Sequence, residues 1–185
     1  MQLPILRYPD KRLRTIAKPV QAVDNGIRTL VDHLFETMYA ESGIGLAATQ
    51  VNQHKQIIVM DVPESKEDYQ ILLENRQNKT RSSRVNNGHP LCFINPSIAK
   101  KSGRDKQTEG CLSVPGFSAE VERYNQITVE ALNEQGEPFT LEANNLLAVC
   151  IQHEIDHLNG ILFVDRLSKL KQKRFLEKLK KRHKK

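Results

Sequence analysis

A stretch of mainly apolar residues at 146–159 is followed directly by Gly160. Apolar side chains occur on most sides of a helix drawn from this stretch, and such a helix must be covered by other parts of the chain. Asn144 or Asn145 can cap its start, and glycine is a common residue just beyond a helix end. The sequence therefore predicts a buried helix at the centre of the fold.

Other segments predict the elements that cover this helix. Apolar residues at helical spacing after an Asp24 cap predict a helix that ends near Ser42 and Gly43. Strands are expected within 56–62 and 91–94, and as a hairpin of 127–132 with 139–143. Together they predict an α+β fold, in which antiparallel or mixed sheets pack around the central helix and a further helix lies at the C-terminus.

The chain of 185 residues has the length of one ordinary domain. We expect a single domain at 1–168, interrupted by a surface insertion at 64–90 in which Ser, Asn, Lys, Arg and Gln dominate. A basic helix or tail is expected at 169–185.

The formal net charge of +6 is unevenly distributed. Residues 169–185 hold ten Lys or Arg and one acid, a balance of +9, so the remainder holds 18 basic and 21 acidic residues, a balance of −3. A mildly acidic body does not favour DNA as a partner. The basic tail is the feature that keeps a nucleic-acid-binding module as an alternative function; the tail can equally serve solubility.

The sequence carries no signal for a membrane or for secretion. No apolar run approaches the roughly 18 residues of a membrane span, and the first residues, MQLPILR, lack the basic start and apolar stretch of a secretory signal. Three cysteines do not make a disulfide framework. We therefore expect a cytoplasmic protein without a membrane partner.

The predicted central helix contains the sequence HEIDH at 153–157, an H-E-x-x-H motif. Residues four apart lie one above the other on a helix, so His153 and His157 can bind one metal ion, with Glu154 beside the first ligand. The alternative is a solvated helix face that merely carries two histidines and two acids. Flanking apolar residues disfavour it, because buried imidazoles and carboxylates need partners that offset desolvation.

The extended form of this motif has a further histidine at a position that Phe163 occupies in this chain. We therefore expect the third ligand upstream. Cys150 lies about 10.5 Å along the helix from the second histidine, too far for its short side chain. Cys92 lies in an apolar strand pattern typical of a buried cysteine. We therefore predict Cys111, in the segment EGCLSVPG, as the third ligand, against the alternative that it is buried and inert.

Three motifs in order along the chain resemble the signatures of the bacterial peptide deformylases: GIGLAATQ at 43–50, EGCLS at 109–113 and QHEIDH at 152–157. The resemblance extends over 6–20, 24–63 and 95–172. It implies a catalytic domain that hydrolyses the formyl group from the N-terminal formylmethionine of nascent peptides in the bacterial cytoplasm and releases formate.

The resemblance also implies the metal and the catalytic groups. The ligands are Cys111, His153 and His157, and the metal is iron(II), which zinc, nickel or cobalt can replace. Glu154 accepts a proton from the attacking water and passes it to the departing amine. The backbone N–H of Leu112 and the side-chain amide of Gln50 stabilise the oxyanion.

A peptide-binding surface is implied as well. Ile44 and Gly45 are expected to bind the peptide backbone as an added strand. The pocket for the methionine side chain is expected to be lined by Leu146, Val149 and Cys150. Arg123 resembles a substrate-binding arginine, whereas Ser118 stands where many members have another arginine, so contacts to the distal part of the peptide should be weaker.

Two further alternatives remain at this point. A zinc endopeptidase has the same H-E-x-x-H motif but cleaves internal peptide bonds of unformylated peptides. The basic tail either holds the enzyme at the ribosome near emerging chains, as C-terminal extensions do in the deformylase family, or is a charged helix that improves solubility.

Overall fold

The computed structural model describes residues 1–63 and 89–182. Its strands form a five-stranded antiparallel sheet in the order β1-β2-β3-β6-β7 and a separate two-stranded ribbon of β4 and β5. The strands are β1 (Gly45–Ala47), β2 (Ile57–Met60), β3 (Leu91–Ser102), β4 (Asp105–Cys111), β5 (Val114–Arg123), β6 (Gln126–Leu132) and β7 (Pro138–Asn144). The helices are α1 (Asn25–Ala40), α3 (Asn145–Leu158) and α4 (Lys169–Arg182), with short 3-10 helices η1 (Lys11–Arg14), η2 (Ala48–Val51) and η3 (Phe163–Arg166). This arrangement confirms the predicted α+β fold.

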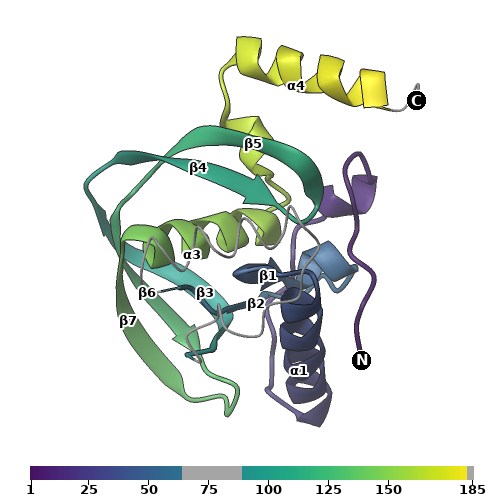
Figure 1. Cartoon of the computed structure of the whole chain (residues 1–185). Helices are drawn as coiled ribbons and strands as arrows, with labels where there is room; N and C mark the ends of the chain where they lie inside the picture. The colour runs from purple at the N-terminus through teal and green to yellow at the C-terminus, as the bar shows by residue number, and fades with distance from the viewer. Residues whose placement is uncertain (64–88, 183–185) are drawn as a thin grey trace.

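Helix α3 lies between the curved five-stranded sheet and the β4–β5 ribbon (Figure 1). Most of its side chains are buried, including Ala148 and Ile151 in the hydrophobic cluster that it shares with the sheet. The chain turns sharply after it at Gly160, where φ is +69° and an added Cβ would lie 2.5 Å from the carbonyl oxygen of Arg14. The predicted central helix and its glycine stop are thus confirmed, and its N-cap residue is Asn144.

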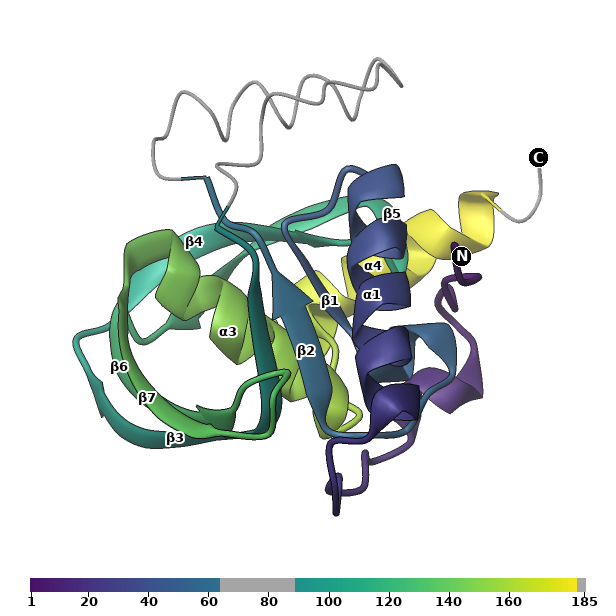
Figure 2. The ribbon, with the colours of Figure 1, turned by 90° about the horizontal axis from the view of Figure 1, so that it is seen from below.

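Helix α1 packs on the other side of β1 and β2 from α3 (Figure 2). The Asp24 side chain accepts a hydrogen bond of 2.8 Å from the Ile27 N–H, as the predicted cap requires. Strand β2 is buried on both faces, because Ile58 packs in the cluster with α3 and Ile57 packs in the cluster with α1. This two-sided burial explains its continuous β-branched run.

The structure confirms the predicted β6–β7 hairpin and extends the strand expected at 91–94. Strand β3 continues to Ser102, and its pairing with β6 shifts register between Ile94 and Ser97, which accommodates Pro96 within a strand. The β4–β5 ribbon was not predicted. The first four residues of β4 are all exposed, so no alternation of apolar and polar residues marks this strand in the sequence.

Helix α4 docks on the outer side of the β4–β5 ribbon (Figure 1), and Phe175 is its buried apolar side chain. The ring of Phe175 lies 4.6 Å from that of Phe117 and 5.3 Å from that of Tyr8. Leu170 and Leu176 are exposed, so the apolar face of this basic helix is narrow. Among the described residues, no helix has both the length and the hydropathy to cross a bilayer. The predicted insertion at 64–90 lies outside the described residues except for 89 and 90.

Candidate metal centre

Helix α3 and the end of strand β4 bring the three predicted ligands together. Cys111 Sγ lies 3.2 Å from His157 Nε2, which lies 3.2 Å from His153 Nε2. All three ligand atoms are within 4.8 Å of one another, all three residues are buried, and the described parts of the chain hold no second group of this kind. One thiolate and two imidazoles suit zinc or iron(II). The donor set therefore fits a divalent metal.

The imidazole of His153 is oriented by Glu109, whose Oε2 lies 2.8 Å from His153 Nδ1. Burial by itself raises the pKa of Glu109, but hydrogen bonds from Arg123 and His153 outweigh it and hold the pKa at about 2. The anionic carboxylate keeps the proton on Nδ1, which leaves the Nε2 lone pair for a metal. Burial is the largest cause that lowers the pKa of His157 well below its usual value. His157 is therefore neutral, as a ligand must be.

The side-chain amide of Gln50 lies beside Cys111. Its Oε1 accepts a hydrogen bond of 2.8 Å from the Ala47 N–H, and its Nε2 donates to Ser113 Oγ at 3.1 Å and to Cys111 Sγ at 3.5 Å. A backbone N–H can only donate, so the amide oxygen must face Ala47 and the amide nitrogen must face the ligands. The fold of η2 thus aims a fixed donor at the centre.

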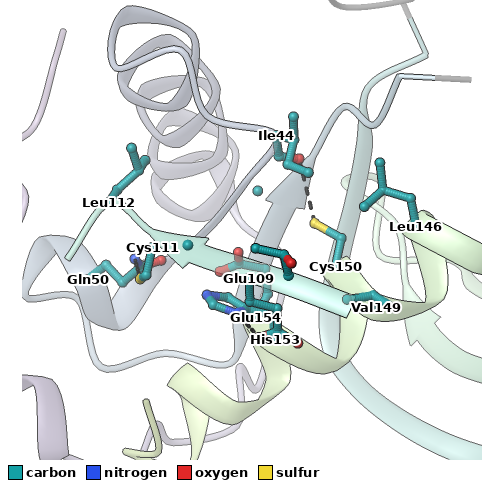
Figure 3. Close-up of a pocket in the computed structure, with 13 residues that line it drawn as sticks. Ile44, Gln50, Glu109, Cys111, Leu112, Leu146, Val149, Cys150, His153 and Glu154 are labelled. Carbon is teal, nitrogen blue, oxygen red and sulfur yellow. Dashed lines mark hydrogen bonds and ion pairs between the residues drawn. The ribbon is translucent and has the colours of Figure 1, made fainter. Parts of the chain in front are cut away.

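Glu154 follows the first histidine on α3 and lies in the same pocket (Figure 3). Its side chain is buried, and its Oε2 has no hydrogen-bond partner among the described residues. Burial raises the pKa of Glu154 to about 7. Strand β1 passes so close that a Cβ on Gly45 would lie 2.6 Å from Glu154 Oε1 and 2.7 Å from Cys150 Sγ. Only glycine at position 45 allows this approach.

A pocket opens beside the centre. It is lined by ten predicted site residues: Ile44, Gly45, Gln50, Cys111, Leu112, Leu146, Val149, Cys150, His153 and Glu154. Strand β4 adds Thr108, Glu109 and Gly110 to the lining. In Figure 3 the apolar side chains of Leu146 and Val149 lie at the end opposite Gln50 and Cys111. The pocket therefore offers an apolar end next to a polar, metal-binding end, which is the usual construction of a small-ligand site.

Comparison with known proteins identifies the family. The sequence model of the polypeptide deformylase family matches residues 2–173. The chain belongs to the peptide deformylase family. A peptide deformylase of Neisseria gonorrhoeae is 53% identical over 98% of this chain and 96% of the relative, and peptide deformylase 1 of Pseudomonas syringae is also 53% identical over the same shares. The crystal structure of an Ehrlichia chaffeensis peptide deformylase in complex with actinonin matches with a TM-score of 0.83 and 43% identity, over all of this chain and 99% of that chain. This deformylase is accordingly a metal-dependent amidohydrolase.

The structure places Arg123 between two buried carboxylates. This residue lies outside the pocket, and its side chain is only 3% exposed. Its guanidinium donates to both Glu109 oxygens, at 2.6 and 2.9 Å, and to Asp156 Oδ2 at 2.6 Å. Two buried carboxylates thus accept hydrogen bonds from all three nitrogens of the guanidinium. Arg123 therefore supports Glu109, which in turn contacts His153, and its expected substrate contact stays a prediction.

Three residues of the site are missing from the sequence-based prediction. Glu109 orients His153, Asp156 binds Arg123 and Arg166, and Gln152 binds the backbone of Tyr124. A signal was available for two of them, because Gln152 and Asp156 are polar residues on a helix predicted to be buried. Glu109 carried no such signal, since β4 was not recognised as a strand.

Proposed function

We propose that this chain removes the formyl group from the N-terminal formylmethionine of newly synthesised polypeptides in the bacterial cytoplasm and releases formate. The observation that carries the proposal is the buried Oε2 of Glu154, which has no hydrogen-bond partner in the described part of the chain and lies in the pocket beside the metal centre. A proton acceptor at this point serves the hydrolysis of an amide held over the metal. Membership of the deformylase family supports a formyl amide as the substrate.

Glu154 is the proposed carrier of the proton. Cys111, His153 and His157 would hold a divalent metal, which would supply hydroxide near neutral pH by lowering the pKa of water towards about 7. The Glu154 carboxylate accepts a proton from the attacking water, and its pKa of about 7 suits both gain and loss of a proton. The same carboxyl group then donates the proton to the methionine nitrogen as the bond between this nitrogen and the formyl carbon breaks.

Two donors are proposed for the oxyanion that forms on the formyl oxygen. The amide of Gln50 is held by Ala47 and Ser113, so its Nε2 needs no reorganisation when charge develops. Leu112 follows Cys111 directly and also lines the pocket, and we assign its backbone N–H as the second donor. Each such donor is typically worth about 3 kcal/mol of transition-state stabilisation.

Strand β1 is the proposed docking edge for the peptide. It ends the five-stranded sheet and pairs there with β2 alone, so its other edge can receive an added strand. The Ile44 carbonyl already accepts a hydrogen bond of 3.0 Å from the Asp61 N–H, which holds this segment in place. We propose that the backbone of Ile44 and Gly45 binds the peptide. The methionine side chain is proposed to enter among Leu146, Val149 and Cys150.

A comparison of two peptides tests this function. Purified protein is given formyl-Met-Ala-Ser and, separately, an unformylated peptide of similar composition, and formate and internal cleavage products are measured. Formate release from the first peptide without internal cleavage of either is the expected result. Internal cleavage of the unformylated peptide would instead support the zinc endopeptidase.

Iron(II) is the proposed native metal, with zinc, nickel or cobalt as substitutes. Thiolate and imidazole ligands suit both iron(II) and zinc, so the donor set supports iron without excluding zinc. Protein purified without oxygen should hold iron and be more active than the same protein loaded with zinc. An enzyme that is purified with zinc and keeps its full activity in air would contradict the iron assignment.

Helix α4 is proposed to hold the enzyme at the ribosome. Its basic side chains at 171, 173 and 174 are exposed, and the helix is anchored by Phe175 alone among its strongly buried residues. Lys173→Glu with Lys180→Glu reverses charge without touching the anchor, so sedimentation with ribosomes at low salt should fall while activity on short peptides stays unchanged. Unchanged sedimentation would favour the solubility role.

A further inference from the structure

The metal centre is assembled from two parts that no sheet hydrogen bond joins. The histidines lie on α3, whereas Cys111 ends β4 of the separate two-stranded ribbon. The distance between helix and ribbon therefore decides whether three ligand atoms can meet one metal. Gln152 and Asp156, two buried polar residues of the QHEIDH motif, have no part in the proposed reaction but both face this junction.

Asp156 binds the ribbon through a side chain. Its Oδ2 accepts a hydrogen bond of 2.6 Å from Arg123, the last residue of β5. Arg123 also binds Glu109 of β4 through two hydrogen bonds, and Glu109 contacts His153 Nδ1. A continuous chain of buried polar contacts thus leads from α3 through both ribbon strands and back to a metal ligand.

Gln152 binds the ribbon through the backbone. The Tyr124 N–H donates to Gln152 Oε1 at 3.1 Å, and Gln152 Nε2 donates to the Tyr124 carbonyl at 2.7 Å and to the Ala148 carbonyl at 2.9 Å. Both amide hydrogens and the amide oxygen are therefore used. Tyr124 directly follows Arg123, so this amide fixes the corner between β5 and β6 against α3.

We propose that Gln152 is a positioning residue of the metal centre. By holding the Tyr124 backbone it sets the place of Arg123, hence of Glu109, and through the ribbon the distance of Cys111 from the two histidines. Loss of this hold lets the ribbon move away from α3 and weakens metal binding. The inference rests on the metal centre of the proposed function and is independent of the substrate.

The chain offers a matched control for Gln152. Asn95 in β3 also binds both backbone groups of one residue, since the Val20 N–H donates to Asn95 Oδ1 and Asn95 Nδ2 donates to the Val20 carbonyl, both at 2.8 Å. Asn95 and Val20 do not line the pocket. Gln152→Glu and Asn95→Asp each replace one NH₂ donor with oxygen and add one negative charge. Each therefore loses a hydrogen bond to a backbone carbonyl, at Tyr124 and at Val20 respectively, and Gln152→Glu also loses the one to the Ala148 carbonyl within α3.

The first experiment measures metal affinity. Metal-free, full-length proteins are titrated with Co²⁺ without oxygen, and the thiolate-to-cobalt absorption is followed in competition with a chelator. Gln152→Glu should bind Co²⁺ about tenfold more weakly than wild type, the lower end for residues that orient metal ligands. The added negative charge alone would strengthen cation binding, so it cannot cause this loss. Uncharged Gln152→Met should show the same loss, and Asn95→Asp should bind as wild type does.

Three results would overturn the proposal. They are a wild-type affinity in Gln152→Met, a wild-type affinity in Gln152→Glu, and an equal loss in Asn95→Asp, which would indicate a general effect of lower stability. Absence of Co²⁺ binding by the wild-type protein would instead refute the metal centre itself, and with it the proposed function.

A second experiment needs no variant. Coupling between metal binding and the hydrogen bonding of Gln152 to the Tyr124 backbone is reciprocal. If these hydrogen bonds strengthen metal binding tenfold, metal binding must stabilise them tenfold. Saturating Zn²⁺ should therefore slow hydrogen exchange of the wild-type Tyr124 amide about tenfold more than that of the Val20 amide. Equal slowing at both amides would contradict the proposal.

Discussion

Replacement of Gly45 by alanine tests how strand β1 places the catalytic carboxylate. The added Cβ would lie 2.6 Å from Glu154 Oε1, whereas ordinary contact begins at 3.4 Å, so the two must separate by about 0.8 Å. Cys150 Sγ, at 2.7 Å, must move as well. The colliding atoms end two side chains and are not part of the backbone, so the chain can yield without unfolding.

The two expected effects differ in size. Overpacking of this kind typically costs 1–3 kcal/mol, and we expect about 1 kcal/mol here because side-chain ends give way. A displacement of about 1 Å in a catalytic group typically lowers the rate about 100-fold, and we expect a loss of this order in kcat. No ligand atom is among the close contacts of the new Cβ, so metal content should not change.

The assay compares kcat for formate release, metal content and urea unfolding in wild type, Gly45→Ala and Gly110→Ala. Gly110 lines the same pocket, but its added Cβ would meet nothing closer than the Phe117 carbonyl at 3.8 Å. Gly110→Ala should therefore keep a kcat close to that of wild type. A wild-type kcat in Gly45→Ala with metal bound would refute the claim that β1 fixes Glu154.

Three further substitutions have distinct expected results. Arg123→Met removes the guanidinium from buried Glu109, which keeps only its contact with His153, and leaves Asp156 with Arg166 alone. It should lower the free energy of unfolding in urea by about 3–5 kcal/mol; unchanged stability with a higher KM for longer peptides would favour a substrate-binding role. Gln50→Ala should lower kcat by a factor of about 100 to 1,000 while the metal is retained, measured by formate release and metal analysis. In the metal-free protein Glu154 has a pKa of about 7 in the folded state, against 4.5 for an ordinary glutamate. Between these two pKa values the folded state binds more protons than the unfolded state, so the stability of the wild type falls as the pH rises. Glu154→Gln removes this loss and should become the more stable protein by about 3 kcal/mol above pH 7, measured by urea unfolding from pH 4 to 8; a gap that does not grow with pH would contradict the buried acid.

The central part of the fold was predictable because burial leaves a clear pattern in the sequence. The apolar surroundings of His153 and His157 predicted the central helix, and a two-sided run of β-branched residues predicted β2. The Asp24 cap and the Gly160 stop were predictable because they depend on local backbone chemistry. Strand β4 gave no such pattern, since its side chains from 105 to 108 face solvent.

The metal ligands were predictable because their chemistry restricts the residue types, whereas their supports were not. The role of Arg123 depends on the pairing of β4 with β5, which places Glu109 and Arg123 where both can meet α3. The need for glycine at position 45 likewise depends on how closely β1 approaches Glu154, and this distance is set by tertiary packing. Residues that act through long-range contacts of this kind leave little local trace in the sequence.

Metal content and formate release in wild type, Cys111→Ala and Glu154→Ala test most directly the claim that one metal centre and one carboxylate perform the reaction. Cys111→Ala should lose the metal and the activity together, because two imidazoles remain from a three-ligand site. Glu154→Ala should keep one metal per chain and release formate at least about 100-fold more slowly, as expected when a general acid–base is removed. Full metal content in Cys111→Ala, or wild-type turnover in Glu154→Ala, would contradict the account.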